Sequence, residues 1–175
     1  IEALVRWEHP ELGLLPPSHF LPLAEETGLI LSIDTWMLHT ACEQNRAWQQ
    51  AGFPPMCISV NLSARQIQQP HFSEVILRIL NETGIRPELL DLEITENIAM
   101  HDVVSSIADF TRLADCGVGL SIDDFGTGYS SLSLLSKLPI HRLKIDKSFI
   151  KGINETPDSK ELINSIVALA HSLKL

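Results

Sequence analysis

Two adjacent aspartates, Asp123 and Asp124, follow the apolar run 118–122 and precede the glycine-containing turn FGTG. Neighbouring carboxylates repel each other, so two of them at the end of a buried strand call for a positive partner. Carboxylate oxygens are the ligands that Mg²⁺ and Mn²⁺ prefer. Of two adjacent carboxylates, one could bridge a pair of ions while the other binds only the second. The stretch therefore predicts a site for a pair of divalent metal ions.

Other polar residues recur along short apolar segments of the chain. These are Glu2, Arg6, Asn61, Glu93 and Lys144, with Glu96 just beyond one of the segments. Each acid taken alone favours an ordinary role as a strand-end residue or helix cap. Their joint occurrence, in phase on five segments, favours a shared site of oxygen ligands. Lys144 alone would also allow a Schiff-base lysine of an aldolase-type barrel, but the surrounding acids favour a metal.

The elements that must position these residues alternate along the chain. Segments rich in Val, Ile and Leu predict strands over 1–6, 57–61, 90–95, 118–123 and 142–146. Apolar residues at three-to-four spacing predict helices over 32–52, 71–84, 102–117 (with Asp102 as its cap), 130–139 and 158–175. Strands that alternate with helices are typical of parallel sheets with helical crossovers.

A doubly wound sheet and a (β/α)8 TIM-type barrel both satisfy this order, and side-chain parity separates them. Ile58 and Val60 alternate with Ser59 and Asn61, and the other strands show the same two phases. Strands of a doubly wound sheet are apolar on both faces, whereas a barrel can hold polar residues inside. Parity favours an α/β barrel, of which the chain supplies about five of the eight strands.

Composition excludes some functions. The 175 residues carry a formal net charge of −9, which argues against binding a nucleic-acid polymer or an anionic membrane. The chain contains no apolar run of about 20 residues, the length of a membrane span. The three cysteines match no zinc pattern and predict buried free thiols in a reducing cytosol. The seven histidines are scattered and predict packing or surface positions.

Several motifs resemble those of the EAL domain, the bacterial cyclic di-GMP phosphodiesterase module. They occur in family order and cover nearly the whole chain: EALVR (2–6), PSHFLPLAEETGLI (17–30), NLSARQ (61–66), LEITE (92–96), DDFGTGYSSL (123–132) and LKIDKSFI (143–150). The resemblance implies metal-dependent hydrolysis of cyclic di-GMP to linear pGpG, with two Mg²⁺ or Mn²⁺ ions, in bacterial second-messenger signalling. The alternative is a catalytically silent cyclic di-GMP receptor or a protein-interaction module.

The resemblance also implies a role for each matching residue. The metal ligands would be Glu2, Asn61, Glu93 and Asp123, with Asp124 serving the second ion. Lys144 matches a lysine that contacts the attacking water, and Arg6 matches an arginine that binds a substrate phosphate. Glu96 matches a glutamate that holds the loop after the aspartates.

The motifs also indicate what the chain lacks relative to the family. Residues 1–175 correspond to a partial domain, without the first strand and without the seventh and eighth strands. The seventh strand carries the glutamate usually assigned as general base, so we expect the intact parent protein to be active and the 175-residue piece alone to be inactive. We also expect a cytoplasmic domain fused to sensory or cyclase domains. Homodimerisation and a membrane anchor elsewhere in the parent stay open.

Overall fold

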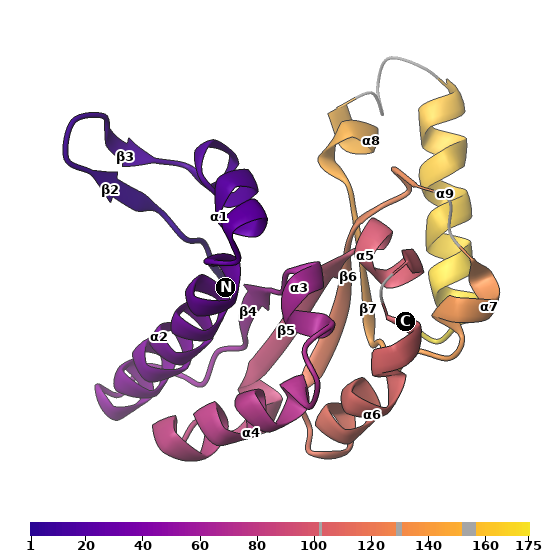
Figure 1. Ribbon diagram of the computed structural model, residues 1–175. Helices are drawn as coiled ribbons and strands as arrows, with labels where there is room; N and C mark the ends of the chain where they lie inside the picture. Colours follow the sequence, from indigo (N-terminus) through magenta and orange to yellow (C-terminus); the bar gives the residue numbers. More distant parts are fainter. Residues whose placement is uncertain (102, 129–130, 152–156) are drawn as a thin grey trace.

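A five-stranded parallel sheet forms the centre of the molecule in the computed structural model (Figure 1). The structure describes residues 1–101, 103–128, 131–151 and 157–175. The strand order is β1-β4-β5-β6-β7, so each strand lies beside its neighbour along the chain apart from an intervening hairpin. These strands are Glu2–Ala3, Ile58–Asn61, Leu90–Thr95, Gly119–Phe125 and Arg142–Ile145. The expected α/β fold with parallel strands is confirmed.

Helices follow the strands and cover one face of the sheet. The α-helices are α1 (Leu21–Thr27), α2 (Ile30–Gln50), α3 (Ala64–Ile67), α4 (Phe72–Thr83), α5 (Glu96–His101), α6 (Ile107–Asp115), α7 (Leu132–Leu135), α8 (Lys147–Lys151) and α9 (Pro157–Ser172). Helices α2, α4 and α6 lie side by side in that order, and α9 packs against β7 (Figure 1). Short 3₁₀ turns span Pro17–His19, Pro87–Leu89 and Val104–Ser106.

Side-chain parity along the strands divides the sheet as expected. The aliphatic residues Ile58, Val60, Leu92, Ile94 and Ile122 are buried in one core cluster with apolar residues of α2, α4 and α6. The alternate positions carry polar side chains on the opposite face. Four of these are also buried: Ser59, Asp91, Glu93 and Ser121. The sheet therefore has an apolar side toward the helices and a polar side that carries the candidate site.

Three expected elements are shorter than the sequence indicated. The strand expected over 1–6 pairs only at Glu2–Ala3, and the helix expected over 130–139 spans Leu132–Leu135 within the described residues. The helix expected over 102–117 begins at Ile107, after the 3₁₀ turn Val104–Ser106. The Ser106 hydroxyl donates to the carbonyl of Ile67, which holds the turn against α3. The proposed cap, Asp102, lies outside the described residues.

The sequence analysis also missed the hairpin of β2 (Trp7–His9) and β3 (Gly13–Leu15), which extends away from the sheet beside α1 (Figure 1). The His9 Nδ1 atom accepts the backbone N–H groups of Glu11 and Leu12, each at 3.2 Å, and closes the turn. Three paired residues per strand are too few to show an alternation pattern.

Two further expectations concern the state of the cysteines and the possibility of a membrane-spanning helix. The three cysteines are free, as expected, but only Cys42 is buried, whereas Cys57 is half-buried and Cys116 is exposed. Burial raises the pKa of the Cys42 thiol to about 12. Within the described ranges, the helices are too short or too polar to cross a bilayer.

Candidate active site

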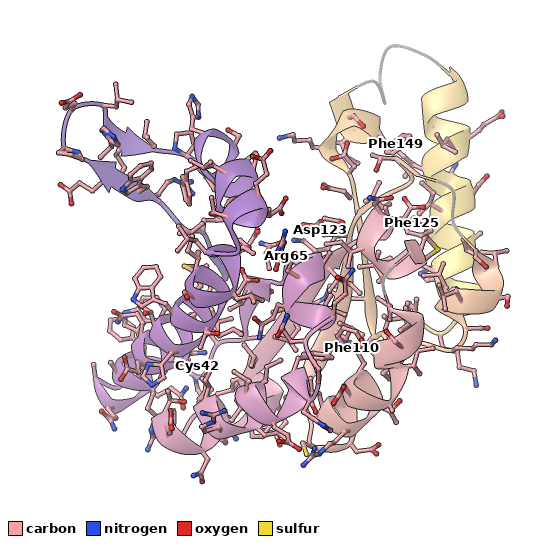
Figure 2. The ribbon with its side chains drawn as sticks, in the orientation of Figure 1. Cys42, Arg65, Phe110, Asp123, Phe125 and Phe149 are labelled. Carbon is pink, nitrogen blue, oxygen red and sulfur yellow. The ribbon has the colours of Figure 1, made fainter. Side chains whose placement is uncertain are left out.

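Three carboxylates from three strands meet on the polar face of the sheet. Oxygen atoms of Glu2, Glu93 and Asp123 lie within 4.8 Å of one another. They come from β1, β5 and β6, whose parallel arrangement brings their carboxyl ends to one edge of the sheet, and Figure 2 shows Asp123 at that edge. Glu93 is only 2% exposed, whereas Glu2 is exposed. The cluster therefore combines one buried anchor with more accessible ligand atoms.

Lys144 of β7 supplies a positive charge to this cluster. Its Nζ atom donates to Glu93 Oε2 at 2.7 Å and to Asp123 Oδ2 at 3.1 Å, and it lies 3.8 Å from Glu2 Oε2. Burial alone would lower the pKa of Lys144, but the hydrogen bonds to Glu93 and Asp123 outweigh it and raise that pKa. Three carboxylates and one ammonium leave a net charge of −2 (three negative, one positive), which suits a divalent cation.

A β-bulge explains how two consecutive aspartates reach the same site. In a regular strand Asp123 and Asp124 would point to opposite faces. The pairing of β6 with β7 passes from Ile122–Leu143 to Phe125–Ile145, so β6 carries one extra residue at this point. Asp124 also has a φ of +52°, in the left-handed region that aspartate tolerates better than most residues. The bulge turns both carboxylates toward β7.

Asp146 is a functional candidate that the sequence analysis missed. It follows β7, two residues after Lys144, and its carboxyl faces Asp124. Burial raises the pKa of Asp124, and the negative charges of Asp123 and Asp146 raise it further. Hydrogen bonds from Ser148 lower the pKa of Asp146. The spacing of Asp146 from Lys144 in KID was the available signal, because residues two apart on a strand share a face.

Glu96 holds the loop that follows the two aspartates. It is the first residue of α5, is 1% exposed, and its Oε2 accepts the backbone N–H groups of Gly126 at 2.8 Å and Gly128 at 3.1 Å. On its other side, a Cβ atom on Gly126 would lie 2.8 Å from the ring of Phe149, a residue of α8 (Figure 2). The loop is therefore fixed between a buried carboxylate and an aromatic ring.

The remaining two candidates are placed differently. Asn61 of β4 donates Nδ2 to Glu2 Oε1 at 2.9 Å, which brings it into the cluster. Arg6 lies beyond the end of β1, where the chain has left the sheet for the hairpin, and its Nη1 donates to the carbonyl of Val5 at 2.8 Å. Within the described part of the chain, no ion pair joins Arg6 to the carboxylate cluster.

A buried carboxyl on α2 supports the segment after Asn61. Asp34 is 7% exposed, and its Oδ2 accepts the Ser63 hydroxyl at 2.5 Å. Ser63 in turn caps α3 by accepting the N–H of Gln66. Burial raises the pKa of Asp34 to about 6, although the hydrogen bonds from Ser63 oppose the rise. The folded protein therefore favours the protonated carboxyl more than the unfolded chain does.

We expect Asp34 to make stability fall as pH rises. A raised folded-state pKa contributes stability that is complete below the unfolded value of 3.8 and is lost as pH rises through about 6. Asp34→Asn should remove this dependence, so between pH 5 and 7 the variant should gain about 1 kcal/mol relative to wild type. Urea denaturation at both pH values, followed by tryptophan fluorescence, measures the difference. Parallel pH profiles of the two proteins would contradict the assignment.

The donor set fits a divalent cation of the hard, oxygen-preferring kind. The cluster offers carboxylate oxygens from Glu2, Glu93 and Asp123, and the side-chain amide of Asn61 beside them. Asp124 and Asp146 form a second pair of carboxyls next to Asp123. None of these groups is a thiolate or an imidazole, so the set suits Mg²⁺ or Mn²⁺ better than zinc. Asp124 would be available to a second ion next to the first.

A parallel α/β sheet with helices on its outer side and clustered carboxylates at its carboxyl ends defines a barrel-type domain with its polar site at the usual end. The EAL domain family model matches residues 1–175, and the chain belongs to this family. Relative to its homologues the chain is a partial EAL domain, and EAL family enzymes are typically metal-dependent.

Two of the relatives come from Pseudomonas aeruginosa. The chain is 46% identical over 175 residues to the bifunctional diguanylate cyclase/cyclic di-GMP phosphodiesterase MucR, covering all of this chain and 26% of MucR. It is 41% identical to the cyclic di-GMP phosphodiesterase NbdA, covering all of this chain and 22% of NbdA. The chain therefore spans about a quarter of the length of these multidomain relatives.

Solved structures of EAL domains superpose closely on the chain. The MucR phosphodiesterase in complex with cyclic di-GMP matches with a TM-score of 0.93 and 46% identity, over 99% of this chain and 70% of that one. The EAL enzyme Bd1971, in its cAMP- and cyclic di-GMP-bound form, matches with a TM-score of 0.90 and 32% identity, over 99% and 48%. The chain matches part of a TIM-barrel domain, as the strand parity predicted.

Proposed function

We propose that the intact protein hydrolyses cyclic di-GMP to linear pGpG with the help of Mg²⁺ or Mn²⁺. The observation that carries the proposal is the cluster of Glu2, Glu93 and Asp123 around the ammonium of Lys144. The relation to MucR and NbdA supports the substrate, because both are named as cyclic di-GMP phosphodiesterases.

In this proposal each group of the chain has a defined task. Glu2, Asn61, Glu93 and Asp123 would hold one ion, and Asp124 would serve a second. When bound, the ions polarise a phosphoryl oxygen and make water a stronger nucleophile near neutral pH. Lys144, which is charged at neutral pH, donates hydrogen bonds toward the water and the reacting phosphate. Arg6 would have to turn from the Val5 carbonyl to reach a phosphate.

Metal removal tests the proposal most directly. Hydrolysis of cyclic di-GMP by the intact protein should fall to background after exhaustive EDTA treatment and return with added Mn²⁺, because acidic ligands are the main charges at the site. Chromatography of pGpG measures turnover. Full turnover without metal, or trapping of a Lys144 adduct by borohydride, would overturn the proposal, and tight binding without turnover would indicate a receptor.

We expect Glu96→Ala to reduce turnover by about 10²-fold, because each hydrogen bond to a charged acceptor contributes about 1.5–3 kcal/mol and two are lost from the loop. Mn²⁺ affinity should change much less, because Glu96 accepts from Gly126 and Gly128 and stands outside the carboxylate cluster. Turnover and equilibrium dialysis of Mn²⁺ measure the two effects. Wild-type turnover in Glu96→Ala would remove the loop-anchor role.

A further inference from the structure

A second layer of polar side chains lies on the polar face of the sheet, two residues along each strand from the carboxylate cluster. Its members each precede a candidate site residue by two positions on the same strand: Ser59 precedes Asn61, Asp91 precedes Glu93, Ser121 precedes Asp123, and Arg142 precedes Lys144. Residues two apart on a strand share a face and lie about 6.6 Å apart. The second layer therefore lies directly beneath the first.

Asp91 joins the members of this second layer. It is fully buried, and its Oδ2 accepts the hydroxyls of Ser59 at 3.2 Å and Ser121 at 2.8 Å. Arg142 Nη1 donates to the same oxygen at 3.0 Å. On the Oδ1 side, the Nε2 atom of His141 lies 3.7 Å away. One carboxylate on β5 is thus tied to side chains of β4, β6 and β7.

The strands that Asp91 joins are the ones that carry four of the candidate site residues: Asn61, Glu93, Asp123 and Lys144. The hydrogen bonds within the sheet set the register, but β6 bulges and β7 is short at the level of the cluster. Side-chain bonds from Asp91 add a second constraint on the spacing of these strands immediately below the bulge. Partners outside the ligands of a metal site commonly control affinity by orienting those ligands.

We propose that Asp91, held by Arg142 and the two serines, is a positioning residue that sets the spacing of Glu93, Asp123 and Lys144 and thereby the metal affinity of the site. This inference rests on the proposed function, because it requires the upper cluster to bind a divalent ion. Among the described residues no side-chain hydrogen bond or ion pair joins Asp91 to the cluster, so it acts through the strands.

The direction of the change in cation affinity distinguishes positioning from a simple charge effect. Arg142→Met removes a positive charge near the cation site, so through-space electrostatics alone predicts tighter cation binding. If Asp91 acts through geometry, loss of the Arg142 contact loosens β7 and weakens binding instead. Arg142→Lys keeps the charge and part of the contact, so it should recover much of the affinity.

The experiment measures Mn²⁺ affinity of the intact protein by equilibrium dialysis, without substrate. Arg142→Met should weaken Mn²⁺ binding about tenfold or more, and Arg142→Lys should restore most of it. Arg112→Met is the matched control: the Arg112 side chain is 53% exposed, against 50% for Arg142, and it pairs with Glu74 on the outer helices. The control should bind Mn²⁺ as wild type does.

Ser121→Ala provides a second variant in case Arg142→Met does not fold. It removes the hydroxyl that donates to Asp91, which lies 2.8 Å from Oδ2 and 3.0 Å from Oδ1, and it changes no charge. We expect it to weaken Mn²⁺ binding several-fold. Unchanged or tighter Mn²⁺ binding in Arg142→Met would overturn this inference and leave the proposed function standing. If Arg142→Met does not fold, the same result in Ser121→Ala would overturn it. Failure of the wild-type protein to bind Mn²⁺ would overturn the proposed function and this inference with it.

Discussion

Asp123→Ala should abolish the metal-dependent hydrolysis of cyclic di-GMP, with a loss of at least about 10³-fold in kcat/KM. Asp123 contributes an oxygen to the carboxylate cluster, accepts a hydrogen bond from Lys144 at 3.1 Å, and accepts the N–H of Asp124 at 2.9 Å. In the proposed function it would also be one of the ligands of the first ion. A metal site supplies several kcal/mol of charge stabilisation, and about 1.36 kcal/mol corresponds to a tenfold change in rate.

Asp115→Ala is a suitable control for this variant, because Asp115 is exposed at the end of α6. Asp123→Asn should fall between the two, since it keeps the shape and one oxygen but loses the charge. Steady-state kinetics with saturating Mn²⁺, together with Mn²⁺ dialysis, distinguish a loss of chemistry from a loss of affinity. Near-wild-type kcat/KM in Asp123→Ala would exclude the cluster as the catalytic centre.

Gly126→Ala should lower kcat/KM by about 10²-fold, through the loop that follows the aspartates. Gly126 has a φ of +101°, which a residue with a side chain adopts only at a cost of about 1–3 kcal/mol. Its new Cβ would also lie 2.8 Å from Phe149 and 3.3 Å from Ile166. The loop would have to move, and its hydrogen bond to Glu96 would be lost with it.

Gly52→Ala separates backbone strain from the effect on the site. Gly52 has a φ of +89° at the end of α2, with no atom within 4 Å of an added Cβ. Both variants should lose stability, but only Gly126→Ala should lose activity. Phe149→Ala added to Gly126→Ala should relieve the steric clash and recover part of the rate. Equal kcat/KM values for the two glycine variants would show that the loop does not need its observed conformation.

The parity of the strands made the fold and much of the site predictable. Ser59, Asn61 and Glu93 alternate with buried aliphatic residues, and parallel pairing brings the carboxyl ends of such strands together. That reasoning placed Glu2, Glu93, Asp123 and Lys144 on one face, which is where the structure brings them close. The sequence motifs for the EAL family pointed to the same set.

Other features depend on tertiary contacts that leave little trace in the sequence. The bulge at Asp123 and Asp124 breaks the alternation, and a regular strand would have separated the two carboxylates. The role of Asp91 was not recognised from the sequence, because Glu93 alone already accounted for the polar face of that strand. Arg6 was assigned to the polar face by extending strand parity through residue 6, although pairing stops at Ala3.

Strand β5 and the start of α5 carry two roles within four residues. Glu93 contributes to the carboxylate cluster, Glu96 holds the backbone of the loop at Gly126 and Gly128, and both side chains are almost fully buried. The loop and the cluster are therefore joined by a short run of backbone, although they depend on different side chains. A molecule that bound residues 125–128 would change turnover more than ion affinity, because Glu96 lies outside the carboxylate cluster.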